Sequence, residues 1–384
     1  MIPTQVTDQE KVQVWKAYRD HRPVRVPVTF GCNPRVVVLD PHYNTGGWTF
    51  EAAAKDPRTH IEVALHFALY MRTVMGPHSD LPTALPEVWE VGLNVYNVYE
   101  AAFFGAPVQF QNGQVPCTEP FLTEGNRESI FAVDVDHPLE NPYIRQCLGF
   151  WREMEKICRD LKFEGRPVKL TPWALTGTDG PVTVGCNLCG SAFIEDLAGD
   201  PDYAGRLMSL ITRAAIQRRR AFWLYWGDRI GHGNGIADDS IALISSDMYR
   251  ALVLPLHRQL YEAADADHGA KLLRGIHLCG DATRHFAAIH RELDVVSFDT
   301  GFPVDHGGLR RQLGLEVELL GGPEVSCLLE GSPQQVYERT RSILGSGVKE
   351  GGRFTLREGN NLPPRVPQAN LAAMYEACLE HGRY

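Results

Sequence analysis

The sequence predicts an α/β fold, a (β/α)8 TIM barrel that forms a single domain over residues 1–384. Three observations favour this fold. Short apolar segments alternate with segments of helical periodicity, which is typical of parallel strands joined by right-handed crossovers. Eight such apolar segments can be counted, the number that closes a barrel. No Gly-x-Gly-x-x-Gly motif follows the first of them, which argues against the alternative, a doubly wound open sheet.

In the first half of the chain we expect three strands separated by helices and long loops. A helix over residues 8–20 forms an N-terminal extension that packs over one end of the barrel. The loop-like segment 111–138 is expected to form an insertion over one barrel face. The strands are expected over residues 25–31, between residues 82 and 97, and over residues 167–175, and the helices over residues 49–75 and 141–161.

In the second half, five further strands alternate with helices. The fourth strand is expected over residues 234–240, and the fifth ends in Gly275-Ile276-His277-Leu278-Cys279. The remaining strands are expected over residues 293–299, 315–320 and 353–357. Helices are expected over residues 194–222, after the capping residues Ser246-Asp247, and over residues 332–344 and 368–381.

Composition excludes several classes of function. A net charge of −9 and the lack of a basic stripe make a nucleic-acid partner unexpected. No run of about 18 apolar residues occurs, so no membrane span is expected. Residues 1–24 lack the apolar core of a signal peptide, and the nine cysteines are scattered along the chain. These features predict reduced thiols in a cytoplasmic enzyme.

His277 and Cys279 are two residues apart at the end of an apolar run. On a strand, their side chains project from the same face, because strand side chains alternate with period two. Nitrogen and sulfur ligands together suit a borderline-soft ion such as zinc. A buried cysteine and a hydrogen-bonded histidine that merely end a strand are the structural alternative.

Polar and thiol side chains recur at the predicted strand ends. In a barrel of this type the C-terminal strand ends form the mouth in which active sites lie. Cysteine is usually buried, so its repetition at one rim favours chemistry over packing. The residues at or just past these ends are Cys32, Asp80, Cys186 with Cys189, Asp238 with Asp239, His277 with Cys279, Asp299, Cys327, and Glu358 with Asn360.

The sequence resembles the uroporphyrinogen decarboxylase superfamily, and most of all its corrinoid- and coenzyme M-linked methyltransferases. The resemblance covers residues 165–384 well and the first half loosely. It rests on five segments of this chain: Glu195-Asp196-Leu197-Ala198-Gly199-Asp200-Pro201, the run from Ile241 to Pro255, His277-Leu278-Cys279-Gly280-Asp281, Glu330-Gly331-Ser332-Pro333-Gln334-Gln335-Val336, and the run from Asn360 to Asn370.

The resemblance implies a zinc site that contains His277 and Cys279. In the zinc methyltransferases of this family a distant cysteine is the third ligand, and its position falls near Asn360, where this chain has no thiol. Cys327, expected on the loop after the seventh strand, is the first substitute, and Glu358 is the second. The pair Cys186 and Cys189 is the third.

The preferred functional hypothesis is a methyltransferase that moves a methyl group to or from a thiol or a corrinoid. Zinc and a corrinoid on a partner protein are its implied cofactors, and a small molecule is its substrate. Asp239 and Asp299 are expected to orient the substrate or accept a proton, with solvated or capping roles as the alternative. Asp80 is loosely similar in position to the catalytic aspartate of the decarboxylases.

Two other hypotheses remain at this stage. A decarboxylase of a porphyrinogen-like polycarboxylic acid needs no metal but requires a basic cluster in the mouth. Arg25, Arg35 and Arg357 are its candidate members. The third hypothesis is a barrel that binds a corrinoid or another ligand without catalysis.

Overall fold

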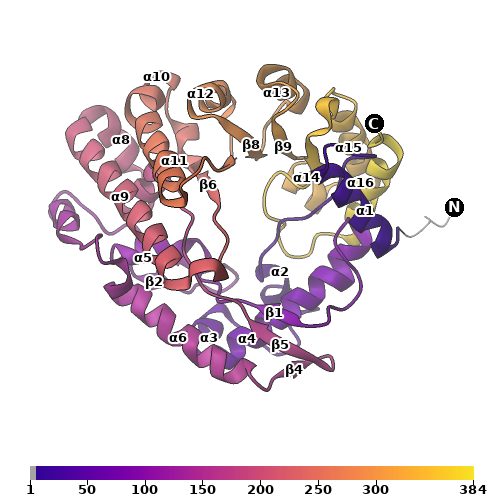
Figure 1. Ribbon diagram of the computed structural model, residues 1–384, viewed down its shortest axis with the longest axis horizontal. Helices are drawn as coiled ribbons and strands as arrows, with labels where there is room; N and C mark the ends of the chain where they lie inside the picture. The colour runs from indigo at the N-terminus through magenta and orange to yellow at the C-terminus, as the bar shows by residue number, and fades with distance from the viewer. Residues whose placement is uncertain (1–5) are drawn as a thin grey trace.

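The computed structural model describes residues 6–384 and places the strands of its main sheet inside a ring of helices (Figure 1). The main sheet has five parallel strands in the order β10-β9-β8-β7-β6. Each neighbouring pair in this order is consecutive in the chain and is joined by helices, as in a barrel wall. The strands are β6 (Asn234–Ala237), β7 (Arg274–Leu278), β8 (Val295–Thr300), β9 (Glu318–Gly321) and β10 (Phe354–Leu356).

A second sheet comes from the first half of the chain. It contains β1 (Trp89–Val91), β5 (Arg166–Leu170) and β4 (Lys162–Phe163) in the order β1-β5-β4. β1 and β5 are parallel, whereas β4 and β5 are antiparallel. The predicted insertion contributes to a separate antiparallel pair, β2 (Val108–Gln109) and β3 (Cys117–Thr118).

Two single contacts extend the main sheet at its edges. Val28 forms a parallel bridge with Leu356 beside β10. At the other edge, the Ala237 amide donates a hydrogen bond to the Thr178 carbonyl, 2.9 Å away. The parallel α/β fold is thereby confirmed, with its strands in barrel order. Residues 6–384 do not form one continuous ladder of eight strands, so full closure stays a prediction.

The helices cover the outer side of the strands (Figure 1). Several begin with a side-chain cap, for example Thr7 before α1 and Ser332 before α15. The helices are α1 (Asp8–Arg19), α2 (Arg35–Val38), α3 (Phe50–Lys55), α4 (Pro57–Tyr70), α5 (Tyr99–Phe103), α6 (Pro142–Cys158), α7 (Pro181–Cys189), α8 (Ala192–Gly199), α9 (Pro201–Trp226), α10 (Ser246–Met248), α11 (Leu254–His268), α12 (Thr283–Leu293), α13 (His306–Leu313), α14 (Val325–Glu330), α15 (Pro333–Leu344) and α16 (Gln368–His381). No described helix is long and apolar enough to cross a membrane.

Proline explains where two predicted strands are shorter than expected. The segment 25–31 contains Pro27 and forms isolated β-bridges at Arg25 and Val28 instead of a continuous strand. The third predicted strand ends at Leu170, just before Thr171 and Pro172. Proline has no N–H to donate to a ladder, so pairing stops near it. The expected loop edge at residues 97–100 is helical instead, where a short turn leads into α5.

The core follows the two sheets. One large cluster of buried residues joins the five-stranded sheet to its helices. A smaller cluster packs β1 and β5 against α4 and α6 through residues such as Ile61, Trp89 and Met154. In β7 burial alternates along the strand, with Ile276 and Leu278 buried and His277 only partly buried. His277 is therefore free to face the interior of the ring, where chemistry is possible.

Candidate metal centre

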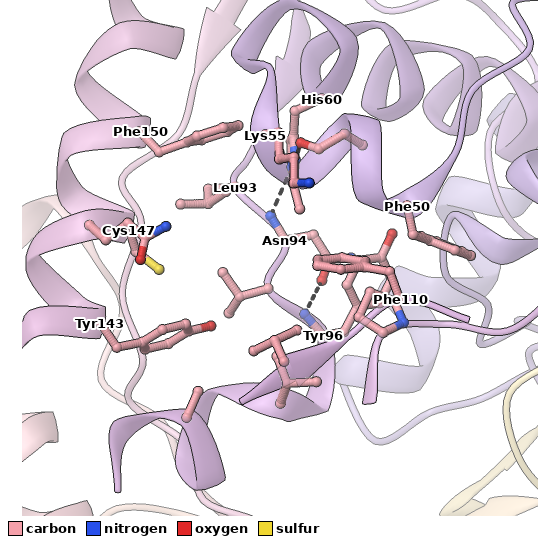
Figure 2. Close-up of a pocket in the computed structure, with 18 of the residues that line it drawn as sticks. Phe50, Lys55, His60, Leu93, Asn94, Tyr96, Phe110, Tyr143, Cys147 and Phe150 are labelled. Carbon is pink, nitrogen blue, oxygen red and sulfur yellow. Dashed lines mark hydrogen bonds between the residues drawn. The ribbon is translucent and has the colours of Figure 1, made fainter. Parts of the chain in front are cut away.

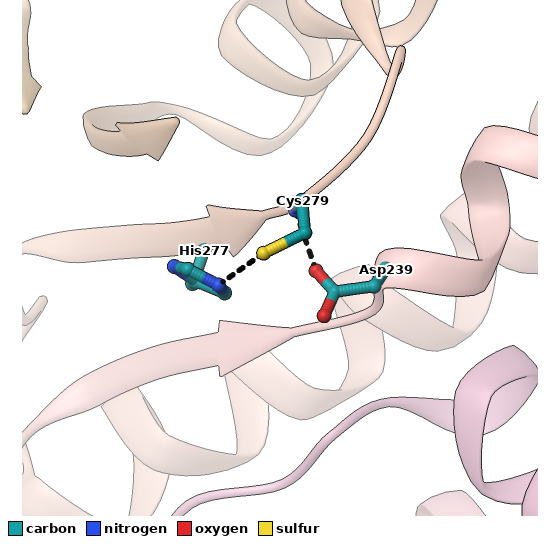
Figure 3. A group of neighbouring side chains, drawn as sticks. All are labelled: Asp239, His277 and Cys279. Carbon is teal, nitrogen blue, oxygen red and sulfur yellow. Dashed lines mark hydrogen bonds between the residues drawn. The ribbon is translucent and has the colours of Figure 1, made fainter. Parts of the chain in front are cut away.

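Strand register brings Asp239, His277 and Cys279 together. β6 and β7 are parallel, and Ala237 pairs with His277. Two residues further along each strand are Asp239 and Cys279, which therefore lie side by side past the strand ends (Figure 3). One ligand atom from each of the three residues lies within 4.8 Å of the others. All three side chains are partly buried. The three residues form what we call the Asp-His-Cys group.

Hydrogen bonds fix the geometry of the group. His277 Nε2 lies 3.0 Å from Cys279 Sγ, which confirms that the two side chains share one face of the strand. The Cys279 amide donates to Asp239 Oδ1 over 2.6 Å. Asp239 Oδ2 accepts no hydrogen bond from residues 6–384, so it remains available as a ligand atom.

Asp299 orients the His277 ring from the neighbouring strand. In the register of β7 and β8, His277 pairs directly with Asp299. Nδ1 of His277 donates to Asp299 Oδ2 over 2.8 Å, which leaves Nε2 directed at Cys279. Burial lowers the pKa of His277, but the hydrogen bonds to Asp299 and Cys279 outweigh it and raise that pKa to about 10.

Arg357 connects this arrangement to the end of β10. Its Nη1 donates to Asp299 Oδ2 over 2.9 Å, and its Nη2 donates to Glu358 Oε1 over 2.7 Å. The Glu358 carboxylate also accepts from the Gly31 amide. Burial raises the pKa of Glu358 to about 7, although Arg357 opposes this shift. Glu358 therefore contacts Arg357 and the Gly31 amide and does not belong to the Asp-His-Cys group.

The backbone of Gly301 packs closely against the backbone of Cys279. Gly301 follows β8, and its amide donates to the Leu278 carbonyl over 2.8 Å. A Cβ atom at Gly301 would lie 2.7 Å from Cys279 Cα, closer than real contacts allow. A side chain at this position would thus displace the thiol that the site uses.

The structure does not bring the expected substitutes for the third ligand to the group. Cys327 was expected on a loop, but it lies in helix α14, and Glu324 and Arg339 are its charged neighbours. Cys186 and Cys189 lie in helix α7, and Cys189 Sγ contacts the Tyr203 hydroxyl at 3.7 Å. The third member of the group is instead Asp239, which the sequence suggested only as a substrate-orienting or proton-accepting residue.

Asp80 lies in a buried ion pair away from the group. Its carboxylate accepts from both terminal nitrogens of Arg25, at 2.7 Å and 2.5 Å, and from the Tyr375 hydroxyl at 2.9 Å. It also accepts from the Val28 amide. These four donors occupy both carboxylate oxygens of Asp80. The contacts join the segment 25–31 to α16, so the role of Asp80 here is structural.

The arginines proposed for a decarboxylase all have partners. Arg25 binds Asp80. Arg35 donates to the Leu362 carbonyl over 3.0 Å and to the Asn361 carbonyl. Arg357 bridges Asp299 and Glu358. These contacts do not create the free basic cluster that a polycarboxylic substrate requires.

A second polar network, not predicted from the sequence, lies beside the group. Glu100 in α5 and Arg218 in α9 form a buried ion pair of 2.6 Å, and the Asp179 amide donates to Glu100. Burial and the nearby charges of Glu100 and Asp239 raise the pKa of Asp179 to about 7. Asp179 stands in a loop between a strand and the proline that begins α7, and this setting is the signal that could have identified it.

The donor set fits a catalytic zinc ion. Three ligands, one each of nitrogen, sulfur and oxygen, leave a fourth position open for substrate. Histidines that bind metals almost always donate their other ring N–H to a carboxylate or carbonyl, as His277 does to Asp299. His277, Cys279 and Asp239 are the residues that would hold the ion.

Three comparisons connect this geometry to known proteins. The family model described as "Uroporphyrinogen decarboxylase (URO-D)" matches residues 91–381. A methylated-thiol–coenzyme M methyltransferase of Methanosarcina mazei is 33% identical over 143 residues, which are 37% of this chain. The match spans 35% of the length of that curated relative.

Solved structures agree on the fold. A methyltransferase from Methanosarcina mazei superposes with a TM-score of 0.64 at 17% sequence identity, over 98% of this chain and 99% of that one. This likeness confirms the α/β fold. A putative vitamin-B12 independent methionine synthase from Listeria monocytogenes, at 9% identity and a TM-score of 0.34 over 92% of this chain and 93% of that one, is too distant to add to it.

Proposed function

The chain belongs to the uroporphyrinogen decarboxylase family, and we propose that within this family it is a zinc-dependent methyltransferase that acts on a thiol. The observation that carries the proposal is the convergence of Asp239, His277 and Cys279 within 4.8 Å. The partial similarity to a methylated-thiol–coenzyme M methyltransferase supports the same chemistry. Arg25, Arg35 and Arg357 are each engaged with partners within residues 6–384, which favours this function over decarboxylation.

The residues in and around the Asp-His-Cys group have separate roles in such a site. When bound, zinc favours the thiolate form of a thiol in its open position. Asp299 holds the Nδ1 proton of His277, which presents Nε2 as a ligand. Asp239 anchors the Cys279 amide through Oδ1 and offers Oδ2. Cys279 would hold the ion as a thiolate.

The methyl group would move between a sulfur atom and a second carrier. We propose a small-molecule thiol as one partner of the exchange and a corrinoid, held by a separate protein, as the other. Transfer to the thiol forms a sulfur–carbon bond and breaks the bond between the methyl carbon and its carrier.

Metal analysis of the full chain tests the proposal. Protein purified without chelators and equilibrated with zinc is expected to hold one zinc ion per chain by mass spectrometry. His277→Ala and Cys279→Ser are expected to lose the ion, and Asp239→Asn to bind it more weakly. Cys327→Ser is the matched control, because that thiol lies in α14 and outside the group. Equal loss in Cys327→Ser and Cys279→Ser, or no stoichiometric zinc, contradicts the proposal.

An activity assay follows the same variants. Methyl transfer from methylcobalamin to coenzyme M is expected for the wild-type chain and for Cys327→Ser. The reaction is expected to fall by several orders of magnitude in His277→Ala, because the open zinc position is then lost. If the chain binds stoichiometric zinc but transfers no methyl group to any thiol, the proposed metal site stands and the proposed thiol acceptor is rejected.

A further inference from the structure

A cavity of about 500 Å³ lies between α3, α4, α5, α6 and the loop that follows β1 (Figure 2). Its volume is within the range of small-molecule sites. The described residues that line it fall between Phe50 and Phe150, so none belongs to the Asp-His-Cys group. The cavity is therefore distinct from the proposed metal centre.

The walls of the cavity are mostly apolar and nearly free of charge. Phe50, Phe110 and Phe150 line it together with small aliphatic side chains. Among the described lining residues, Lys55 alone carries a full charge at neutral pH, and its ammonium group pairs with Glu51 at 2.6 Å. An ionic ligand would lose its hydration there without gaining an opposite charge, so the walls select a neutral molecule.

His60 stiffens one wall and remains neutral. Its Nδ1 lies 3.1 Å from the Ala53 carbonyl, and its Nε2 accepts from the Asn94 amide over 3.1 Å (Figure 2). One ring nitrogen thus donates and the other accepts, which fixes a neutral tautomer. Burial also lowers the pKa of His60. The loop after β1 is held in place by this contact, so this wall of the cavity is preformed.

Two tyrosines, Tyr96 and Tyr143, line the cavity beside the amide side chains of Asn94 and Gln146. Tyr143 projects from α6 toward the centre of the cavity (Figure 2). Tyr96 has φ of +54°, a left-handed conformation that is uncommon outside glycine, and its ring packs edge-on against Phe50 with centroids 5.2 Å apart. Burial raises the pKa of the Tyr96 hydroxyl, and no hydrogen bond of that hydroxyl with residues 6–384 contributes to the shift. A non-glycine residue in this strained conformation persists only where the surrounding structure holds it in place, and such residues are often found at ligand contacts.

We propose that this cavity is a binding site for a neutral, largely apolar ring compound with a hydrogen-bond acceptor, recognised by the Tyr96 and Tyr143 hydroxyls. The aromatic walls contact the faces and edges of the ring. Helix α5 contacts both the cavity and the second polar network. Ala102 of α5 lines the cavity, whereas Glu100 of α5 pairs with Arg218 and accepts from the Asp179 amide. Occupancy of the cavity therefore bears on the same helix that positions Asp179.

Fluorescence titration with prodan, a neutral naphthalene ketone, tests the proposal on the full chain. Saturable binding with blue-shifted emission is expected, with Kd below about 1 mM. Val95→Trp fills the cavity and is expected to weaken binding at least about tenfold. Tyr143→Phe removes one donor and is expected to weaken it about three- to tenfold.

Two controls locate the dye. Val12→Trp adds an indole on α1, where the side chain is 59% exposed, and is expected to leave binding unchanged. Cys279→Ser reports on the metal centre and is also expected to leave it unchanged. Loss of binding in Cys279→Ser but not in Val95→Trp, or no saturable binding by the wild-type chain, overturns the proposal. If Val95→Trp does not fold by circular dichroism, unchanged affinity in Tyr143→Phe overturns it.

Discussion

The carboxylate of Asp299 lies 2.8 Å from Nδ1 of His277, and the two residues are direct partners across strands β8 and β7. This relationship decides which nitrogen of the ring faces Cys279. It also explains why Asp299, expected from the sequence to contact substrate, is better understood as a residue that positions a ligand.

Asp299→Asn is expected to weaken zinc binding about 10- to 100-fold, because the ring loses the anionic acceptor that orients it. Competition with a chromogenic chelator measures the change. Asp305→Asn is the control, since the Asp305 side chain is 73% exposed and caps α13. Unchanged zinc affinity in Asp299→Asn would contradict the positioning role.

Gly301→Ala is expected to destabilise the protein by about 1–3 kcal/mol and to lower zinc affinity, because its Cβ would press on Cys279 Cα. Urea denaturation and chelator competition measure the two effects. Gly205→Ala, in helix α9 with no atom within 4 Å of the added Cβ, is expected to be neutral or to stabilise by up to about 1 kcal/mol. Wild-type zinc affinity in Gly301→Ala would show that packing of Gly301 against Cys279 does not position the thiol.

Arg218→Met is expected to lower the free energy of unfolding by about 3–5 kcal/mol, because Glu100 would be left charged and buried. The double variant Glu100→Gln, Arg218→Met is expected to recover part of this loss. Lys16→Met removes an ion pair whose side chains are 62% and 52% exposed, and its effect should stay below about 1 kcal/mol. Equal losses in Arg218→Met and Lys16→Met would contradict the buried pairing.

His306 is expected to make the protein less stable in mild acid. Burial, with a smaller contribution from Arg339, lowers its pKa from 6.5 to about 4. Between these values the unfolded chain binds a proton that the native state does not, so stability falls as the pH drops, by about 3 kcal/mol in total.

Urea denaturation from pH 7 to pH 4 measures this dependence. His306→Gln is expected to lose less stability than wild type over that range, and His42→Gln, with an exposed side chain, to follow the wild type. Parallel curves for wild type and His306→Gln would show that His306 does not resist protonation in the native state.

Much of the second half could be predicted from the sequence, because its strands are short, apolar and regularly spaced. The face shared by His277 and Cys279 followed from strand periodicity alone. Asp239 could not be assigned to the same group, since that needs the register of β6 against β7, which only the folded chain fixes. Cys327 was placed wrongly because a helix begins directly after the Gly321 strand end and its short turn.

The contacts of single charged residues were the least predictable part. No sequence pattern around Arg357 predicts its hydrogen bond to Asp299, which lies across the intervening strand β9. Asp80 and Glu100 both carry acid groups near turns, yet each is buried against an arginine far away in the chain. Such pairs depend on three-dimensional packing and leave no periodic pattern in sequence.

The Gly31 amide donates to Glu358 across 327 positions of the chain. During synthesis on the ribosome, the segment around Gly31 therefore emerges long before its partner exists. Forming so distant a contact is slow, because a long loop must close before the contact contributes. The Gly31 amide lacks this acceptor until Glu358 has been synthesised, so the contact can form only when nearly the whole chain is available.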